Sequence, residues 1–150
     1  MAPLEETDSI TNEAVISGGG ITPITVTETV SPESEPILTI TKSVSPVPVT
    51  ENGTLTYTFI IQNSGNAPAV ATTDVVLTDD FNPILTSLTV SFNGIPWVEG
   101  TNYTYDEVTG EFATILGQVT VPAATFTQNP VTGAWIINPG VSTLVVSGII

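Results

Sequence analysis

The segment from Thr54 to Gln62 alternates apolar and polar side chains with a period of two, and this pattern limits the possible folds most strongly. Its apolar set is Leu55, Tyr57, Phe59 and Ile61, and threonines fill the positions between them. Such alternation is typical of a β-strand with one face in a core and the other in solvent. Asn52-Gly53, a dipeptide typical of tight turns, comes directly before it. We take this segment as the clearest strand of an all-β fold.

Shorter stretches of the same kind recur between turn signals along the chain. The other expected strands are 38–42, 74–79, 88–92 and 141–150. Two similar hairpin loops, at 104–112 and 126–135, place Val-Thr-Gly just before a new strand, where glycine supplies the positive φ of a bulged turn. A β-sandwich needs roughly 100 residues. The 150-residue chain therefore has room for one sandwich over 37–150 and an N-terminal extension over 1–36.

The charge of the chain excludes several classes of partner. It has fifteen acidic residues, a single basic residue, Lys42, and a net charge of −14. Nucleic acids and anionic lipids are bound mainly through lysine and arginine, so we expect no nucleic-acid role. The acidity is explained by solubility and by repulsion between subunits, with calcium-assisted packing as the sharper alternative.

Catalysis and membrane insertion are not expected. The chain has no histidine and no cysteine, so a thiol nucleophile, a serine–histidine pair and a typical zinc site are all missing. No run of about 18 apolar residues occurs, so we expect no membrane-spanning segment. The first residues are acidic and lack the apolar part of a signal peptide. The sequence predicts a protein that is not an enzyme and needs no cofactor.

The extension differs from the rest of the chain. Its 36 residues hold seven of the fifteen acids. Gly18-Gly19-Gly20 is expected to be a flexible joint, and the strand-like stretch Ile21–Val30 after it has no obvious hairpin partner. The stretch 31–36 is rich in proline and is expected to be a linker. We therefore expect a flexible connector that contains one strand-forming segment.

The series LTITKSVSP, ENGTLTYTFIIQNSGNAPA and DVVLTDDFNP resembles the prokaryotic surface-repeat family known as the domain of unknown function number eleven. The positions that carry the resemblance are Lys42, Pro46, Gly53, Tyr57, Asn63, Gly65, Asp79 and Pro83. The stretches NGIPWVEGTNYTYDEVTGEF and VPAATFTQNPVTGAW are similar to small, single-domain Gram-positive members. The resemblance covers about 37–150 and implies an immunoglobulin-like β-sandwich on adhesin-like or appendage proteins, without enzymatic activity.

The extension suggests how copies of the chain assemble. A lone strand cannot bury its apolar face by itself, but it can add to a sheet edge of the next subunit. Such a head-to-tail contact does not close on itself and makes a filament. The expected donor residues are Ile21, Ile24, Val26 and Val30, and the expected acceptor is the uncharged C-terminal strand with Leu144, Val146 and Ile149. A disordered leader and a strand folded back on its own domain are the alternatives.

Two further sites are candidates. Lys42 lies on the first strand of the body, where pilin-like domains can join a lysine to an asparagine with the help of a buried acid. Asn63, Asn138 and Asp79 are its candidate partners by position. Asp74, Asp79 and Asp80 form a weak calcium candidate, because calcium prefers oxygen ligands.

The sequence thus predicts a structural subunit of an extracellular fibre or appendage, on a cell surface or a spore surface, whose partners are copies of itself. A rival interpretation is an adhesin domain that binds a glycan or a surface protein through loops near Trp97 and Tyr103. In that interpretation Tyr105 and Trp135 also belong to a sugar-stacking patch, although packing of Trp135 in the core and cross-strand pairing of the tyrosines are the simpler explanation. A third possibility is a passive spacer repeat of a larger surface protein.

Overall fold

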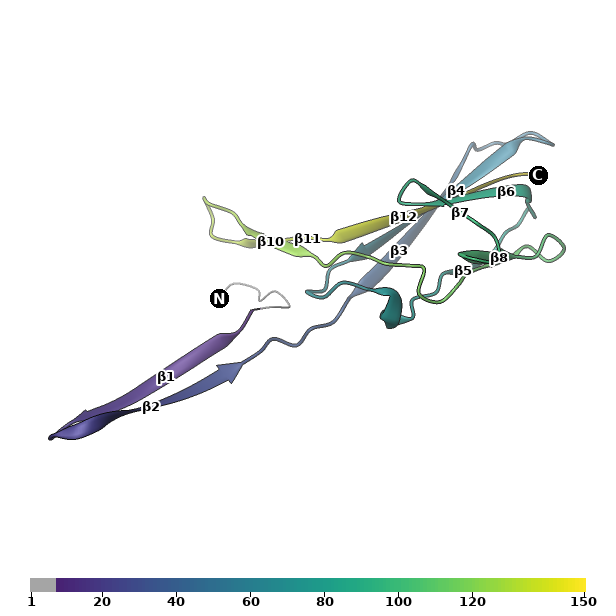
Figure 1. Cartoon of the computed structure of the whole chain (residues 1–150). Helices are drawn as coiled ribbons and strands as arrows, with labels where there is room; N and C mark the ends of the chain where they lie inside the picture. The colour runs from purple at the N-terminus through teal and green to yellow at the C-terminus, as the bar shows by residue number, and fades with distance from the viewer. Residues whose placement is uncertain (1–7) are drawn as a thin grey trace.

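The computed structural model describes residues 8–150, which form β-strands, turns and one short 3-10 helix, η1 (Ala71–Thr73) (Figure 1). The strands are β1 (Ile10–Gly18), β2 (Ile21–Val30), β3 (Leu38–Ser45), β4 (Thr54–Asn63), β5 (Thr78–Asp80), β6 (Thr86–Phe92), β7 (Ile95–Trp97), β8 (Tyr103–Tyr105), β9 (Glu111–Thr114), β10 (Thr125–Gln128), β11 (Trp135–Asn138) and β12 (Gly140–Ile149). The predicted all-β fold is confirmed.

The larger sheet has five antiparallel strands in the order β3-β4-β12-β6-β7. The alternation predicted for the Thr54 segment is confirmed, because every second side chain of β4 is buried. Inward-facing residues of β6 and β12, among them Val90, Leu144 and Val146, continue this apolar surface.

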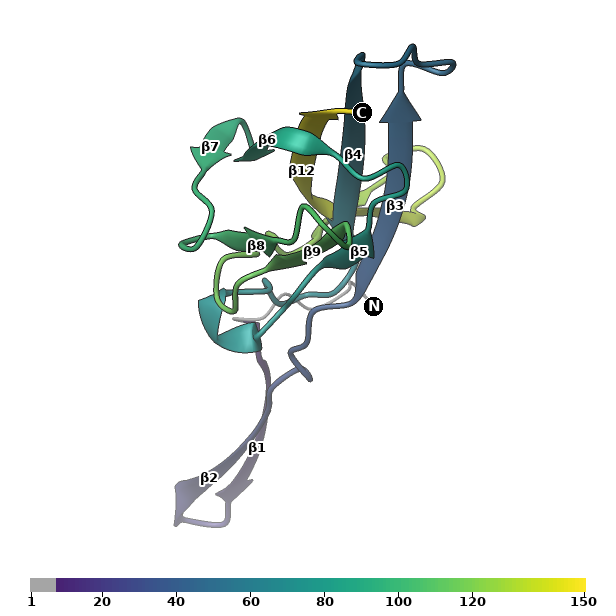
Figure 2. The ribbon, with the colours of Figure 1, turned by 90° about the vertical axis from the view of Figure 1, so that its right-hand side faces the viewer.

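A smaller sheet covers part of this surface with three strands in the order β5-β9-β8 (Figure 2). Phe81, directly after β5, and Phe112 of β9 belong to the same core cluster as the residues of β4 and β12. The ring of Phe81 stacks on that of Tyr57 with 4.8 Å between centroids. The body of the protein is therefore a sandwich of a five-stranded and a three-stranded sheet.

The two predicted hairpin loops are confirmed. β8 pairs with β9, and β10 pairs with β11. Gly110 and Gly133, the glycines of the two Val-Thr-Gly runs, have φ angles of 86° and 70°. Glycine tolerates these positive angles because it has no Cβ.

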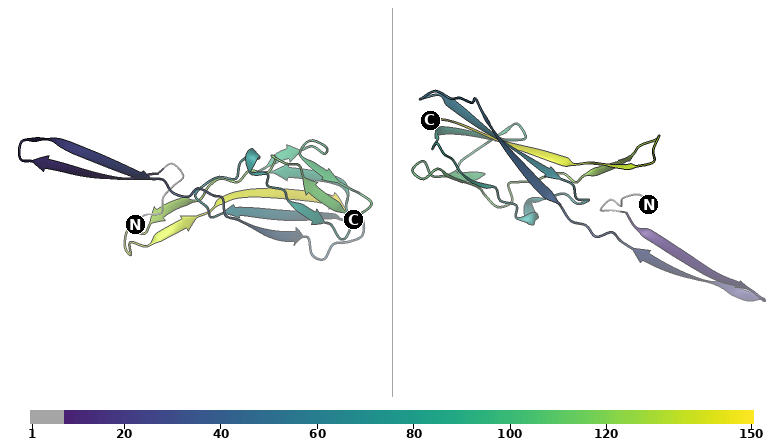
Figure 3. Two further views of the ribbon diagram at one scale, coloured as in Figure 1. Left: turned by 90° about the horizontal axis from the view of Figure 1, so that it is seen from below. Right: turned by 180° about the vertical axis from the view of Figure 1, so that it is seen from behind.

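The extension is a hairpin, and the expectation of a strand without a local partner is wrong. β1 pairs with β2 from Ile10↔Val30 to Gly18↔Ile21, and the hairpin projects away from the sandwich (Figure 3). The triple glycine, expected to be a joint, is the turn, and all three glycines have positive φ. The physical reason is that strand-forming residues flank these glycines on both sides, so the chain pairs with itself.

The expected acceptor strand is also wrong. β12 lies in the centre of the larger sheet and pairs with β4 on one side and with β6 on the other, so it has no free edge. Leu144 and Val146 are completely buried, and Ile149 is partly exposed. Burial within its own domain explains the lack of charge on the inner face of this strand, where every second residue is buried.

The C-terminal end of the predicted linker, 31–36, is attached to the sandwich. The side chain of Asn66 accepts a hydrogen bond from the Glu35 amide and donates one to the Glu33 carbonyl. Asn63 accepts a hydrogen bond from the Ile37 amide, and Gly65 lies so close to Glu35 and Pro36 that a Cβ atom would clash with their backbone. The extension is thus anchored where it joins the body.

Candidate assembly site

β3 is an edge strand whose inward-facing side chains are not covered. Opposite residues of an antiparallel pair share a face. The register pairs Leu38, Ile40, Lys42 and Val44 with the buried residues Asn63, Ile61, Phe59 and Tyr57 of β4. These four residues of β3 therefore face the interior of the sandwich. Nevertheless, Ile40 is 53% exposed and Val44 is 40% exposed. A layer that would cover them is missing among the described residues.

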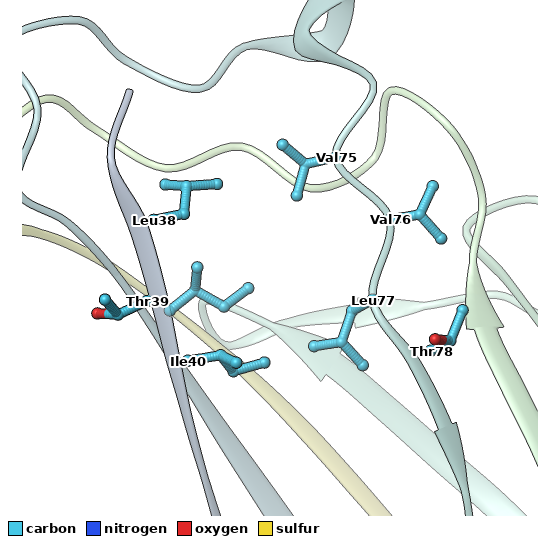
Figure 4. A pocket seen from close by; sticks show the side chains of 8 residues that line it. Leu38, Thr39, Ile40, Val75, Val76, Leu77 and Thr78 are labelled. Atoms are coloured by element: carbon cyan, nitrogen blue, oxygen red, sulfur yellow. The ribbon is translucent and has the colours of Figure 1, made fainter. Parts of the chain in front are cut away.

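The neighbouring edge of the smaller sheet leaves a groove beside β3. Leu38 and Ile40 on one wall and Val75 and Leu77 on the other point into it (Figure 4). Its volume is about 310 Å³. Across residues 8–150, no strand pairs with the outer edge of β3 or of β5. We call this space, with Lys42 and Asp79 beside it, the β3–β5 groove.

Lys42 and Asp79 meet across the groove. The ammonium group of Lys42 forms an ion pair with Oδ2 of Asp79, and its Nζ lies 4.6 Å from the ring centroid of Tyr57. The rings of Phe59 and Phe81 are each 5.6 Å from Nζ. This cationic group therefore lies among aromatic faces, which attract it electrostatically.

The carboxylate of Asp79 is mostly buried, with 17% of its side chain exposed. Oδ1 accepts a hydrogen bond from the Asp80 amide. Oδ2 is buried and accepts no hydrogen bond from residues 8–150, so its compensation is the charge of Lys42. The pair is chemically notable because an amine and a carboxyl group are held in contact at an uncovered edge of the core.

The other predicted partners of Lys42 lie elsewhere. The amide of Asn63 is fully buried and is used in hydrogen bonds with the backbone of Ile37, Gly65, Ala67 and Pro122. Asn138 bonds to Thr125 and Thr127 within the β10–β11 hairpin. Of the candidates named from sequence, the structure thus brings only Asp79 to Lys42.

The predicted calcium site does not assemble. Asp79 points inward and Asp80 outward, because adjacent strand residues face opposite sides. Asp74 lies after η1. In the described part of the chain, no three His, Cys, Asp or Glu side chains are grouped closely enough to hold a metal ion.

The β1–β2 hairpin has an apolar face that is open to solvent. The register places Ile10, Ala14 and Ile16 beside Val30, Val26 and Ile24 on this face. The large residues among them are 40% to 64% exposed. Of the predicted donor residues, Ile24, Val26 and Val30 belong to this face, and Ile21 pairs with Gly18 at the turn. Threonines occupy most of the opposite face of β2.

One cross-strand pair interrupts this apolar face with polar groups. Asn12 of β1 lies opposite Glu28 of β2, and both are exposed. Sequence reasoning missed Asn12 as a candidate. The available signal was that it is the sole carboxamide residue within the first 36 positions.

The residues of the rival sugar-binding interpretation do not gather into one patch. Tyr103 is 4% exposed and stacks on Phe112, and its burial, followed by the nearby charge of Glu99, raises its hydroxyl pKa. Trp97 stacks on Phe92, and Tyr105 donates its hydroxyl to the Leu85 carbonyl. Trp135, expected in the core, is 39% exposed on the separate β10–β11 hairpin. The expected core position of Trp135 is wrong.

Comparison with known proteins finds no family model that matches the chain and no similar curated protein or solved structure. The resemblance to the surface-repeat family therefore stays a prediction. Within residues 8–150, no helix is long and apolar enough to span a membrane.

Proposed function

We propose that this chain is a structural subunit of an extracellular fibre, on a cell or spore surface, in which the β1–β2 hairpin of one copy docks into the β3–β5 groove of the next. The observation that carries the proposal is that the two sheets of the sandwich differ by two strands. A five-stranded sheet faces a three-stranded sheet, and a two-stranded hairpin with an exposed apolar face extends from the same chain.

The dimensions and the charges of the two surfaces suit each other. β1 has nine residues and β2 has ten, while β3, the strand to be covered, has eight. Strands added to the free edge of β5 would place their apolar face over Ile40 and Val44 and their threonines toward solvent. On the docking face the hairpin carries one acid, Glu28, and the groove contains the single lysine of the chain. This cation makes the groove less negative than the rest of the acidic chain, which favours this contact over other contacts between copies.

The completed unit would be an immunoglobulin-like sandwich made from two chains. Strand addition satisfies the free backbone groups of the β5 edge and fills the apolar groove. The β1–β2 hairpin and the β3–β5 groove are different surfaces of the same copy, so the contact is heterologous and produces an open filament. This form of assembly replaces the single donated strand and the C-terminal acceptor that the sequence suggested.

Matched charge substitutions on the two faces of each strand test the proposal. Val26→Asp and Ile40→Asp each place a carboxylate in the proposed contact, whereas Thr25→Asp and Thr41→Asp place it on the opposite face of the same strand. Burying an unpaired carboxylate costs at least about 3 kcal/mol, which weakens association roughly 100-fold.

Negative-stain electron microscopy and sedimentation velocity would measure the outcome. We expect fibres from the unsubstituted protein and from the two threonine variants, and monomers from V26D and I40D. A mixture of V26D and I40D should give dimers, because one functional hairpin and one functional groove remain. Equal assembly of V26D and T25D would contradict the proposal.

A further inference from the structure

Three polar residues each interrupt an otherwise apolar row, and the proposed docking brings the three rows together. Lys42 lies between Ile40 and Val44 on the inner face of β3. Asp79 lies between the buried residues Leu77 and Phe81 beside the groove. Polar groups in buried rows normally require partners.

The third interruption is Asn12, between Ile10 and Ala14 on the apolar face of β1. If this face covers the groove, Asn12 and the Glu28 opposite it are covered as well. Building on the proposed assembly, we propose that Lys42 of one subunit and Asn12 of the next form a covalent amide bond, with Asp79 carrying the proton.

The observed contacts supply the reactive groups. Nζ of Lys42 already touches the Asp79 carboxylate, and apart from Lys42 no group among residues 8–150 compensates this carboxylate oxygen. The aromatic rings of Tyr57, Phe59 and Phe81 shield one side of the amine. The remaining requirement is a carboxamide carbon on the open side, and Asn12 is the one carboxamide that the first 36 residues contain.

The reaction balances without an oxidant or another co-reactant. Asp79 takes one proton from the Lys42 ammonium group, and the neutral nitrogen attacks Cγ of Asn12. The new C–N bond forms while Asp79 returns a proton to the departing amide nitrogen, and the bond from Cγ to that nitrogen breaks. Ammonia takes up the proton that the attacking nitrogen loses and leaves as ammonium. Asp79 is again an ionised carboxylate at the end of the reaction. The product is a secondary amide between two chains.

The alternative partners are less suited to this bond. Asn63 and Asn138 are held in hydrogen bonds away from Lys42. A direct amide between Lys42 and Asp79 would release water instead of ammonia. It would also leave the reaction without its proton carrier, since no other acid contacts the pair within the described chain.

A mixture of two full-length variants tests the bond without building a covalent polymer. Asn12→Ala keeps the lysine and the aspartate, and Lys42→Arg keeps the asparagine, so a mixture can form one covalent junction. We expect a denaturant-resistant heterodimer whose mass is the sum of the two chains less one ammonia. Digestion with a glutamate-specific protease should yield one crosslinked peptide that contains Lys42 and Asn12.

Controls separate the chemistry from docking. Glu13→Gln, next to Asn12 but on the opposite face, should leave the covalent yield unchanged in the otherwise unsubstituted protein. Asp79→Asn should retain native association and lower the rate of bond formation at least 100-fold, with circular dichroism to verify its fold.

The possible outcomes are distinct. Native association of the two variants that dissolves into monomers in hot detergent would overturn the covalent bond and leave the proposed function intact. If the two variants do not associate under native conditions, both the covalent bond and the proposed function are overturned. A monomer lighter by one water would instead establish a Lys42–Asp79 bond and overturn the inference, whereas the ammonia-deficient heterodimer would support it.

Discussion

Lys42 contacts Asp79 across the two sheets of the sandwich, with the amine on β3 and the carboxylate on β5. These two strands are the uncovered neighbouring edges of the two sheets. The ion pair thus bridges the opening through which the core is accessible. This position gives it a structural role in the monomer that can be measured separately from assembly.

Replacing Lys42 with methionine should destabilise the monomer. The substitution leaves the buried carboxylate of Asp79 without its compensating charge. The Lys42 side chain is 40% exposed, so the pair is intermediate between a surface pair and a buried pair. We therefore expect the free energy of unfolding to fall by roughly 1–3 kcal/mol. Urea unfolding in an Asn12→Ala background, which cannot form the proposed bond, measures the loss. A second substitution, Asp79→Leu, should recover most of it, and an unchanged stability of K42M would contradict this role.

Native protein should resist trypsin. Lys42 is the single lysine or arginine of the chain, and its backbone is paired with Phe59 of β4. Cleavage requires an extended segment that can leave its sheet, so the rate should follow unfolding of β3. Gel analysis over time of the Asn12→Ala variant, whose Lys42 keeps a free amine, in native buffer and in mild denaturant makes the comparison. Rapid cleavage in native buffer would show that β3 is not stably paired.

The loop at Asp106 should make a defined contribution to acid unfolding. Hydrogen bonds from the amides of Val108 and Thr109 lower the pKa of Asp106 below its ordinary value of 3.8. A lowered pKa in the folded state means that the carboxylate stabilises the fold fully above pH 3.8 and less as the pH falls through the folded value.

Asp106→Asn should therefore melt at a lower temperature than the parent at pH 7. The difference should shrink to nothing well below pH 3.8, where both side chains are uncharged. The Asn129 loop, which has the same shape with an uncharged cap, shows that asparagine is tolerated at such a position. Thermal melts across this pH range provide the test, and a difference that does not vary with pH would refute the assignment.

Local patterns predicted the longest strands of the body well, because the period of two at Leu55, Tyr57 and Phe59 reports directly on burial. The strand expected over 74–79 is wrong over most of its length, since β5 begins only at Thr78. The turns at Gly110 and Gly133 were equally readable, since each needs a residue that tolerates positive φ. The order of the strands within a sheet could not be predicted in this way. The central place of β12 depends on pairing with β4 and β6, which are far away in sequence, and no local pattern encodes it.

The hairpin partner of β2 was readable but missed. Ile16, Ala14 and Ile10 mirror Ile24, Val26 and Val30 around the triple glycine, and this symmetry is the signal of a hairpin. The Lys42–Asp79 contact was predicted as one of several candidates. Sequence could not choose among them, because the choice depends on which strands form the uncovered edges.

The proposed assembly requires that the hairpin lies in the groove of a neighbouring subunit. An electron cryomicroscopy map of fibres made by the unsubstituted protein measures this position directly. We expect two strands of density beside β5, contributed by the neighbouring subunit, with Asn12 next to Lys42. Density in which every hairpin stays in solvent or lies on its own sandwich, with an empty β3–β5 groove, would contradict the account.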